Sequence, residues 1–255
     1  MIIIDLGNTN IVIGFFYNEK LKKIIRFNKK KFKYNLVFLK IKKILDHNKL
    51  LDKSKKIILG SVVPKKNLEI RKLAKKLSYK IIIIKNKKIN VDFSHSLKAI
   101  NEFGIDRISN AFAANKFYGK NLIIIDFGTA TTFDIVHNGI YEGGIISPGI
   151  EVSNNALAQS AAKINSIKII KTKKIIGKNT LMAIQSGFYW GYLSLINGII
   201  DKIVNEKKFN PNIILTGGMA NIFSNGILIN KKKQKVIIDQ KLTLVGLYHI
   251  GKSYE

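Results

Sequence analysis

The sequence contains one short pattern twice, and this duplication constrains the fold more than any other feature. Three consecutive isoleucines lead into Asp5 and Gly7 near the N-terminus, and three more lead into Asp126 and Gly128. Short runs of β-branched residues that end at polar turn residues are typical of buried strands. The two aspartates lie 121 positions apart in a chain of 255 residues, so each copy opens roughly half of the protein.

Both copies continue as a strand hairpin. A second apolar run follows each polar segment, and the runs close at Asn18-Glu19 and at Asn138-Gly139. The pair Asn-Gly strongly favours a tight turn between two strands. Repeated strand–turn–strand units with the same polar residues indicate two similar domains that face one another across a cleft. We therefore expect an α/β protein with domains at 1–118 and 119–255 and a nucleotide in the interdomain cleft.

Hydrophobic periodicity predicts alternating strands and helices along the rest of the chain. Strands are expected at 2–6, 11–17, 21–27, 57–60, 81–84 and 213–216, with hairpins at 122–146. Helices are expected at 35–47, 66–77, 151–163 and 180–205, together with an Ala-rich helix that begins near Asp106. The lysine-rich segments near 28–33 and 230–235 are expected to be exposed loops.

Composition excludes several classes of site. The chain has no cysteine, which excludes disulfides and thiolate zinc sites, and its four histidines are scattered without metal-ligand spacing. Asp5 interrupts the apolar N-terminus too early for a signal peptide. The apolar stretch 187–200 is too short to cross a bilayer. We therefore expect a cytoplasmic protein.

Lysine gives the chain a formal net charge of +28, from 44 basic and 16 acidic residues. Such a balance is typical of proteins that bind nucleic acid or anionic membranes. The lysines are spread along the whole chain, however, together with abundant Ile and Asn, as A/T-rich codon usage would produce. The aromatic residues fall mostly within apolar runs and do not alternate with basic ones, as a stacking platform requires. We expect no specific nucleic-acid or membrane partner.

The polar residues after the duplicated strands suit a phosphate site. Gly128 permits a tight turn and lets a ligand approach the backbone closely. Thr129, Thr131 and Thr132 add hydroxyl groups beside that turn. A polar β-turn alone would explain one such segment, but the repetition favours two loops that hold one nucleotide.

Three further stretches contain candidate functional residues. Asp106 and Arg107 open the Ala-rich helix after Gly104. Asp106 is either a helix cap or an acid that accepts a proton, and the Arg107 guanidinium can form a forked pair with a carboxylate or phosphate. The Gly-rich segment 143–150 is either a connecting loop or a rigid loop beside a small molecule. The Thr-Gly-Gly turn within 213–220 would seat an adenosine.

Taken in order, five motifs resemble those of the type III pantothenate kinases. They are Asp-x-Gly-Asn-Thr, Gly-x-Asp-Arg, Asp-Phe-Gly-Thr-Ala, Gly-Gly-x-x-x-Pro-Gly and Thr-Gly-Gly, and segment 177–187 is similar as well. The resemblance covers nearly the whole chain. It implies duplicated actin-like (ribonuclease H-like) ATPase domains with mixed sheets and flanking helices. It also implies transfer of the γ-phosphoryl group of ATP to the 4′-hydroxyl of pantothenate, the first committed step toward coenzyme A.

The resemblance implies roles for individual residues. Asp106 corresponds to the acceptor of the pantothenate hydroxyl proton, and Asp126 to a ligand of a monovalent cation, K⁺ or NH₄⁺. Asp5 would hold the Mg²⁺ that accompanies ATP. The expected ATP-binding residues are Asp5, Leu6, Gly7, Asn8, Thr9, Asn10, Ile11, Val12, Gly128, Thr129, Gly217 and Gly218. The expected substrate-binding residues are Leu97, Gly104, Ile105, Asp106, Arg107 and Thr180.

One departure from the family pattern concerns the substrate pocket. The family commonly has a Tyr nine residues before the catalytic acid, followed by a Pro, and here these positions are Leu97 and Ile100. The pocket therefore lacks the hydroxyl that the Tyr would supply. Two alternatives stay open: another small-molecule kinase of the same superfamily, and a non-catalytic regulatory or nucleic-acid-binding homologue.

The segment 181–204 is apolar over more than one helical face. Gly187, Gly191 and Gly198 within it would let a second backbone approach closely. The segment is either a fully buried central helix or part of a contact between two chains. Because the resemblance implies a homodimer, we expect a two-fold dimer that packs partly through this helix.

Overall fold

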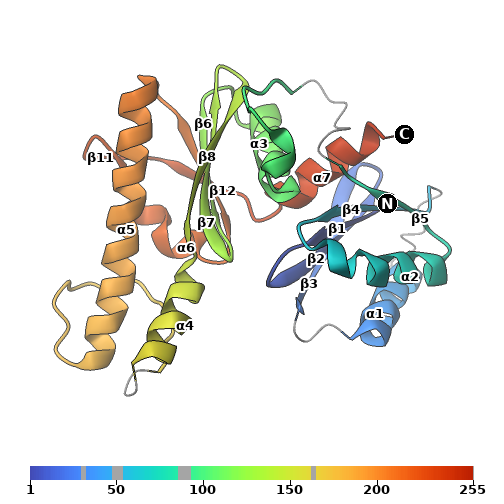
Figure 1. Cartoon of the computed structure of the whole chain (residues 1–255), viewed down its shortest axis with the longest axis horizontal. Coiled ribbons are helices and arrows are strands. Elements are labelled where there is room, and N and C mark those ends of the chain that lie inside the picture. Colours follow the sequence, from blue (N-terminus) through green and yellow to red (C-terminus); the bar gives the residue numbers. More distant parts are fainter. Residues whose placement is uncertain (30–32, 48–53, 86–92, 162–164, 255) are drawn as a thin grey trace. The chain divides into compact units, whose positions relative to one another are not determined.

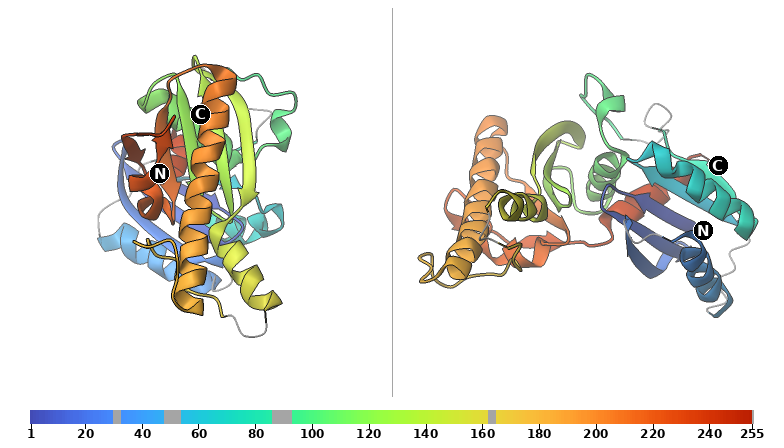
Figure 2. Two further views of the ribbon diagram at one scale, coloured as in Figure 1. Left: turned by 90° about the vertical axis from the view of Figure 1, so that its left-hand side faces the viewer. Right: turned by 60° about the horizontal axis from the view of Figure 1, so that its bottom comes forward.

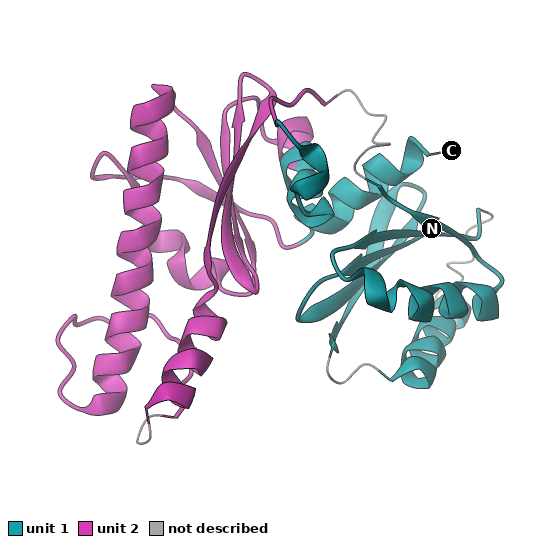
Figure 3. Cartoon of the chain, viewed as in Figure 1, with its two compact units in different colours: residues 1–92, 98–113, 241–255 teal, residues 93–97, 114–240 magenta. Residues whose placement is uncertain are grey.

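The computed structural model describes residues 1–29, 33–47, 54–85, 93–161 and 165–254 (Figure 1). The chain divides into two compact units that are interleaved along the sequence (Figure 3). Unit 1 comprises Met1–Asp92, Lys98–Ala113 and Lys241–Glu255, and unit 2 comprises Phe93–Leu97 and Ala114–Gln240. The division into domains at 1–118 and 119–255 stays a prediction.

Unit 1 is built on a five-stranded mixed sheet in the order β3-β2-β1-β4-β5. Its strands are β1 (Ile2–Leu6), β2 (Asn10–Tyr17), β3 (Lys20–Asn28), β4 (Lys56–Ser61) and β5 (Lys80–Ile83). The strands β1, β2 and β3 are antiparallel to one another, whereas β4 runs parallel to β1 and β5 parallel to β4. Successive residues of a strand point to opposite faces, so β1 sends Ile4 to one face and Asp5 to the other.

Helices cover both faces of this sheet. The helices of unit 1 are α1 (Tyr34–His47), α2 (Asn67–Leu77), α7 (Leu242–Lys252) and the first turns of α3 (Ile105–Phe117), with the short 3-10 helices η2 (Pro64–Lys66) and η4 (Ile100–Glu102). α1 and α2 pack their apolar stripes on the face that carries Ile4. α7 packs on the other face, where Gly60 leaves room for the side chain of Leu247.

Unit 2 repeats this sheet in the order β8-β7-β6-β9-β12. Its strands are β6 (Leu122–Phe127), β7 (Ala130–His137), β8 (Ile140–Pro148), β9 (Asn212–Gly217) and β12 (Val236–Ile238). A separate two-stranded sheet is formed by β10 (Leu228–Ile229) and β11 (Lys232–Lys233). The directions match unit 1, because β6, β7 and β8 are antiparallel neighbours and β9 and β12 continue in parallel.

One long helix covers the apolar face of the second sheet. The helices of unit 2 are α4 (Ile150–Ser160), α5 (Thr180–Lys207), the short α6 (Ala220–Phe223) and the 3-10 helix η5 (Ser224–Gly226). α5 runs along the sheet (Figure 2) and buries Tyr189, Leu193 and Ile196 against the core that contains Phe133. None of the helices in the described part of the chain combines the length and apolar character that a bilayer crossing requires.

The predicted α/β class with two mixed sheets and flanking helices is confirmed. The duplication extends to detail, because both second strands carry a register shift, between Phe15 and Phe16 in β2 and between Ile135 and Val136 in β7. Both hairpin turns use positive φ angles, for example 47° at Asn18. The repeated sequence pattern therefore corresponds to a repeated sheet topology.

The structure differs from the predicted elements at several places. The strand β12 and the short helix α6 are not predicted, and residues 143–148 of the expected loop 143–150 form the second half of β8. No helix is predicted near the C-terminus, yet α7 spans Leu242–Lys252. The expected loop 230–235 contains the strand β11, although its two lysines are exposed. The helix expected at 151–163 ends at Ser160. Residues 162–164, and residues 30–32 of the expected loop 28–33, lie outside the described residues.

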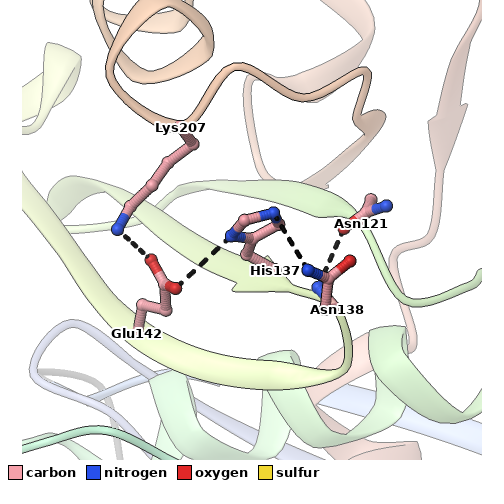
Figure 4. A network of polar contacts seen from close by, with 5 residues as sticks. All are labelled: Asn121, His137, Asn138, Glu142 and Lys207. Atoms are coloured by element: carbon pink, nitrogen blue, oxygen red, sulfur yellow. Dashed lines mark hydrogen bonds and ion pairs between the residues drawn. The ribbon is translucent and has the colours of Figure 1, made fainter.

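A polar network fastens the β7–β8 hairpin to the last turn of α5 (Figure 4). Glu142 accepts a contact from Lys207 Nζ at 2.5 Å and faces His137 Nδ1 at 3.5 Å. The backbone N–H of Asn138 donates to Asn121 Oδ1 at 2.9 Å. The hydrogen bond to Glu142 raises the pKa of Lys207. This network lies at the opposite end of β7 from the loop that follows Asp126, so it stabilises the unit away from the candidate site.

Candidate active site

The first candidate phosphate loop joins β1 to β2. The N–H of Gly7 donates to the carbonyl oxygen of Asn10 at 3.0 Å and closes the turn. Lys29, directly after β3, donates its N–H to the carbonyl oxygen of Thr9 at 2.7 Å. A Cβ atom at Gly7 would lie 3.1 Å from the Asn10 oxygen, so the tight turn favours glycine at this position.

Asp5 precedes this loop on the sheet face that α7 covers. It pairs with Val12 of β2 and with Gly60 of β4, and its side chain is half-buried. Its neighbours Ile4 and Leu6 belong to the opposite face and pack with α1 and α2. The alternation of β1 therefore places the Asp5 carboxylate on the α7 side of the sheet, two residues before Gly7 of the loop.

The second candidate loop joins β6 to β7 and is one residue shorter. The N–H of Gly128 donates to the carbonyl oxygen of Ala130 at 3.0 Å. Gly149, directly after β8, packs against this loop: a Cβ atom there would lie 2.2 Å from the carbonyl oxygen of Thr129. Because only glycine permits this approach, α4 begins against the loop, while Gly128 and Thr129 stay exposed.

The structure brings Asp126 together with the Thr-Gly-Gly turn. Asp126 pairs with Thr216 of β9, and the N–H of Gly218 donates to the carbonyl oxygen of Phe127 at 3.1 Å. Gly217 has φ +84°, and a Cβ atom on it would lie 2.6 Å from Asp126 Oδ1. The Asp126 carboxylate thus lies directly against the backbone of Gly217. The side chain of any larger residue at 217 would occupy the space beside the carboxylate.

Asp106 lies in the first turn of α3. Its Oδ1 accepts a hydrogen bond from the backbone N–H of Arg107 at 2.8 Å. A Cβ atom at Gly104 would lie only 2.2 Å from the same oxygen. Burial raises the pKa of Asp106, while the hydrogen bond from Arg107 and the positive charge of that residue oppose the shift. A carboxyl group with a raised pKa is suited to accept a proton near neutral pH.

Arg107 is buried and holds its guanidinium over the ring of Phe103, 5.0 Å from the ring centroid. Such a contact is a cation–π interaction. Ile105 is buried at the start of α3. The predicted segment 104–107 therefore combines one confined carboxylate with two side chains that anchor the helix.

The remaining predicted substrate residues belong to unit 2. Thr180 is the exposed first residue of α5, which Asn179 caps by accepting the N–H of Met182 at 2.8 Å. Leu97 is half-buried at the end of Phe93–Leu97, a segment joined to β8. Each unit therefore holds one loop and part of the predicted substrate set. Leu97 and Thr180 do not belong to the unit that carries Asp106, and Ile100 does.

The carboxylates do not form a preformed multidentate metal centre. In the part of the chain that the structure describes, no three His, Cys, Asp or Glu side chains are grouped to hold an ion. Asp5 and Asp126 each offer a single carboxylate beside a loop. One carboxylate fits Mg²⁺ bound with ATP, because Mg²⁺ keeps several waters and takes further oxygens from the phosphates.

Comparison with known proteins decides the family. The family model for type III pantothenate kinase matches residues 1–202. The chain belongs to the type III pantothenate kinase family. The type III pantothenate kinase of Persephonella marina is 40% identical over 255 residues, which cover 97% of this chain and 96% of that protein. The type III pantothenate kinase of a Sulfurihydrogenibium species is 36% identical and covers 98% of each chain.

Solved structures agree with this family at the level of the fold. A Campylobacter jejuni protein assigned to the Baf family of transcriptional activators aligns with a TM-score of 0.61 at 20% identity, over 100% of this chain and 98% of that chain. A ROK family glucokinase from Streptomyces griseus, in complex with glucose and AMPPNP, aligns with a TM-score of 0.53 at 11% identity, over 99% of each chain. The predicted actin-like ATPase fold of this type III pantothenate kinase family member is confirmed.

Sequence reasoning missed two supports of the site. The prediction that 143–150 is a loop is wrong, because β8 continues to Pro148 and α4 begins at Ile150, and the close approach of Gly149 to Thr129 depends on this long-range packing. The contacts of α7 with the sheet and with α3 are also missed. Gly246 and Gly251 lie at these contacts, where the missing Cβ atom permits the close approach, but from the sequence alone they do not indicate a helix.

Proposed function

We propose that this chain catalyses the reaction of its family with Asp106 as the general base. Family membership over nearly the full length makes it an ATP-dependent phosphotransferase that phosphorylates pantothenate in coenzyme A biosynthesis. The product would be 4′-phosphopantothenate. The observation that carries the residue assignment is the confined carboxylate of Asp106, which lies in the first turn of α3 against Gly104.

The base would act on the hydroxyl of the acceptor. As the new P–O bond forms and the bond between the γ-phosphorus and the β–γ bridging oxygen breaks, the hydroxyl proton moves to Asp106, and ADP leaves. Phosphoryl transfer depends more on positioning and charge than on covalent chemistry. Only the ionised carboxylate can take the proton. Because burial raises the pKa of Asp106, the rate should fall on acidification at a higher pH than the usual aspartate pKa of about 3.9.

ATP would be bound by backbone amides and hydroxyls of both loops. In unit 1 these are the residues from Asp5 to Val12, and in unit 2 they are Gly128, Thr129, Gly217 and Gly218. Backbone N–H groups in turns are suited to phosphate oxygens. Asp5 would hold Mg²⁺, directly or through water, and bound Mg²⁺ would neutralise charge on the phosphates.

Asp126 would bind a monovalent cation, K⁺ or NH₄⁺. Support comes from its place against the bare backbone of Gly217, where an ion could share the carboxylate and nearby carbonyl oxygens. Activity should then require K⁺ or NH₄⁺ and be poor in Na⁺ at constant ionic strength with Mg²⁺ present. The variant Asp126→Asn should lose most of this difference between salts. Equal rates of the unchanged protein in all three salts would contradict the assignment.

The substrate segment would be Gly104 to Arg107, with Leu97 and Thr180 as further contacts. Leu97 in place of the family's Tyr would leave one polar group of pantothenate without that partner. Restoring the hydroxyl with Leu97→Tyr should therefore lower KM for pantothenate and leave KM for ATP unchanged. An unchanged KM for pantothenate would remove residue 97 from the pocket.

A homodimer is the proposed assembly. Cβ atoms at Gly187, Gly191 and Gly198 of α5 would meet no atom within 4 Å, so this side of the helix is open. Exposed apolar side chains surround the start of α5, including Ile175, Ile176, Leu181 and Met182. A large exposed apolar patch marks an interaction site. Sedimentation equilibrium at micromolar protein should give twice the mass of one chain.

A matched pair of variants tests where the dimer forms. Ile176 is 70% exposed in unit 2, and Leu68 is 68% exposed on α2 of unit 1. Ile176→Glu should give a monomer, because it places a charge in the proposed contact. Leu68→Glu adds the same charge at equal exposure and should stay dimeric. A stable, active monomer of the unchanged chain would exclude the proposed assembly.

One assay tests the function against its alternatives. Release of ADP from ATP is measured with pantothenate, with pantetheine, with a hexose and without acceptor. The proposal predicts rapid release of ADP when pantothenate is the acceptor, and slow release in the other three conditions. Release with another acceptor would indicate a different kinase of the superfamily. If none of the acceptors increases the release of ADP, the chain is a non-catalytic homologue.

A further inference from the structure

The C-terminal helix α7 supports the helix that carries Asp106. α7 lies on the sheet of unit 1, where Tyr248 stacks on Phe16 with ring centroids 4.2 Å apart. Leu247 fills the space above Gly60, the β4 residue that pairs with Asp5. Gly251 is also pressed against the sheet, because a Cβ atom there would lie 2.6 Å from Ile58. α7 is therefore held closely on the sheet face to which Asp5 belongs.

The opposite side of α7 meets α3 with almost no space between the backbones. A Cβ atom at Gly246 would lie 2.0 Å from the backbone oxygen of Ser109 and 2.9 Å from its Cα. These are backbone atoms, which cannot move aside as the end of a flexible side chain can. Gly246 therefore fixes how closely α3 approaches α7.

A partly buried hydrogen bond joins α3 and α7 at the same crossing. Thr243 Oγ1 donates to Asn110 Oδ1 at 2.8 Å, and Asn110 is fully buried. Thr243 lies three residues before Gly246, on the same side of α7. Asn110 lies four residues after Asp106, and residues four apart occupy the same face of a helix. The bond thus acts one turn away from the carboxylate.

We propose that Thr243 and Asn110 are positioning residues for the phosphoryl transfer, because their hydrogen bond holds the first turns of α3 in the rotation that presents Asp106. The inference rests on the proposed role of Asp106 as the base. Neither residue touches the reacting atoms. A displacement of a catalytic group by about 1 Å can cost roughly 10²-fold in rate, so loss of this bond should act on kcat.

The test uses Thr243→Val, which keeps the shape of the side chain but removes the hydroxyl. We expect kcat for pantothenate-dependent ADP release to fall about tenfold or more, with KM for ATP unchanged, because the first phosphate loop is untouched. Thr243→Ser restores a hydroxyl and should restore kcat. Tyr118→Phe is the matched control, since it removes a hydrogen bond to Asp239 (2.9 Å) just beyond the far end of α3, and it should leave kcat unchanged.

Several outcomes would overturn the inference. One is an unchanged kcat in Thr243→Val. The others are a fall in kcat in Thr243→Ser, or in Tyr118→Phe, as large as the fall in Thr243→Val. Circular dichroism verifies that each variant is folded, and Thr243→Ala replaces the Val variant if that one does not fold. An unchanged chain without pantothenate-dependent ADP release would contradict the proposed function, whereas failure of the Val variant to lose kcat in an active enzyme contradicts only this inference.

Discussion

The loops after β1 and β6 occupy equivalent positions in two copies of one sheet, yet their surroundings differ. In unit 1, Lys29 closes the loop by donating its N–H to Thr9 at 2.7 Å. In unit 2, the residue in the equivalent place after β8 is Gly149, whose missing side chain lets α4 begin against Thr129. The scaffold is shared, but backbone at Gly149 approaches the second loop on one side as closely as only glycine allows.

The glycines beside the two carboxylates that we propose as functional, Asp106 and Asp126, extend this comparison. Gly104 lies against Asp106 in unit 1, and Gly217 lies against Asp126 in unit 2, so that a Cβ atom would approach either carboxylate oxygen within 2.6 Å. Gly217 also needs its positive φ of +84°, whereas no positive φ is recorded for Gly104. In the proposed function, the same close approach of a glycine would serve a proton acceptor in unit 1 and a cation ligand in unit 2.

The largest expected effect concerns Asp106, the acid beside Gly104 in unit 1. Asp106→Asn should fold and bind ATP but lose about 10²–10⁴-fold in kcat, the usual contribution of a general base. Glu102→Gln is the matched control, because it removes an exposed acid four residues earlier. Steady-state ADP release with pantothenate measures both. An equal fall in kcat in both variants would mean that the rate depends on the negative charge of this segment and not on Asp106 as a base.

The next effect tests the space beside that acid. Gly104→Ala should push the Asp106 carboxylate out of place, because its Cβ atom would lie 2.2 Å from Oδ1. A displaced catalytic group loses up to about 10²-fold in rate, so kcat should fall while thermal stability changes little. Unchanged kcat would show that the carboxylate can act from another rotamer.

Two adjacent glycines sharpen the comparison in unit 2. Gly217→Ala would strain a positive φ and drive a Cβ atom to 2.5 Å from the Phe127 oxygen, whereas a Cβ atom at Gly218 would meet nothing within 4 Å. Gly217→Ala should therefore destabilise the fold by about 1–3 kcal/mol and raise KM for ATP. Gly218→Ala should leave the unfolding midpoint unchanged or raise it slightly, because alanine fits there. Urea unfolding measures the stability of both variants, and steady-state kinetics measures their KM for ATP. Equal values for Gly217→Ala and Gly218→Ala would contradict this account.

The smallest effect compares the two loops directly. A Cβ atom at Gly7 would lie 3.1 Å from a carbonyl oxygen, but one at Gly128 would lie 3.5 Å from its nearest neighbour, an ordinary contact. Where alanine fits, replacing glycine stabilises a fold by about 0.4–1 kcal/mol. Gly128→Ala should therefore be the more stable of the two variants, by about 1 kcal/mol. A larger free energy of unfolding for Gly7→Ala than for Gly128→Ala, measured with urea, would contradict the tighter turn at Gly7.

Much of the fold was predictable because its signals are local. The paired runs of isoleucine that end at Asp5 and Asp126 predicted the duplicated hairpins, and Asn138-Gly139 predicted the turn of the second. The helix α3 was predicted from its Ala-rich run after Asp106. These features depend on residues that are close in the sequence, and the two sheets confirm them.

What the sequence did not reveal depends on long-range packing. α7 packs between the sheet and α3, so most of its residues are apolar or glycine, and its polar residues Thr243, His249 and Lys252 do not mark a helical period. Its two glycines resemble strand or loop signals until the partners Ser109 and Ile58 are known. The return of residues 241–255 to unit 1 has no local signature either, because strands and helices from both ends of the chain join there.

The identity and amount of the products test the central claim most directly. The unchanged protein and Asp106→Asn are each incubated with ATP, Mg²⁺, K⁺ and pantothenate, and mass spectrometry measures ADP and phosphorylated pantothenate over time. The account predicts equal amounts of the two products from the unchanged protein and almost none from Asp106→Asn at saturating ATP. ADP without phosphorylated pantothenate, or equal rates from both proteins, would contradict it.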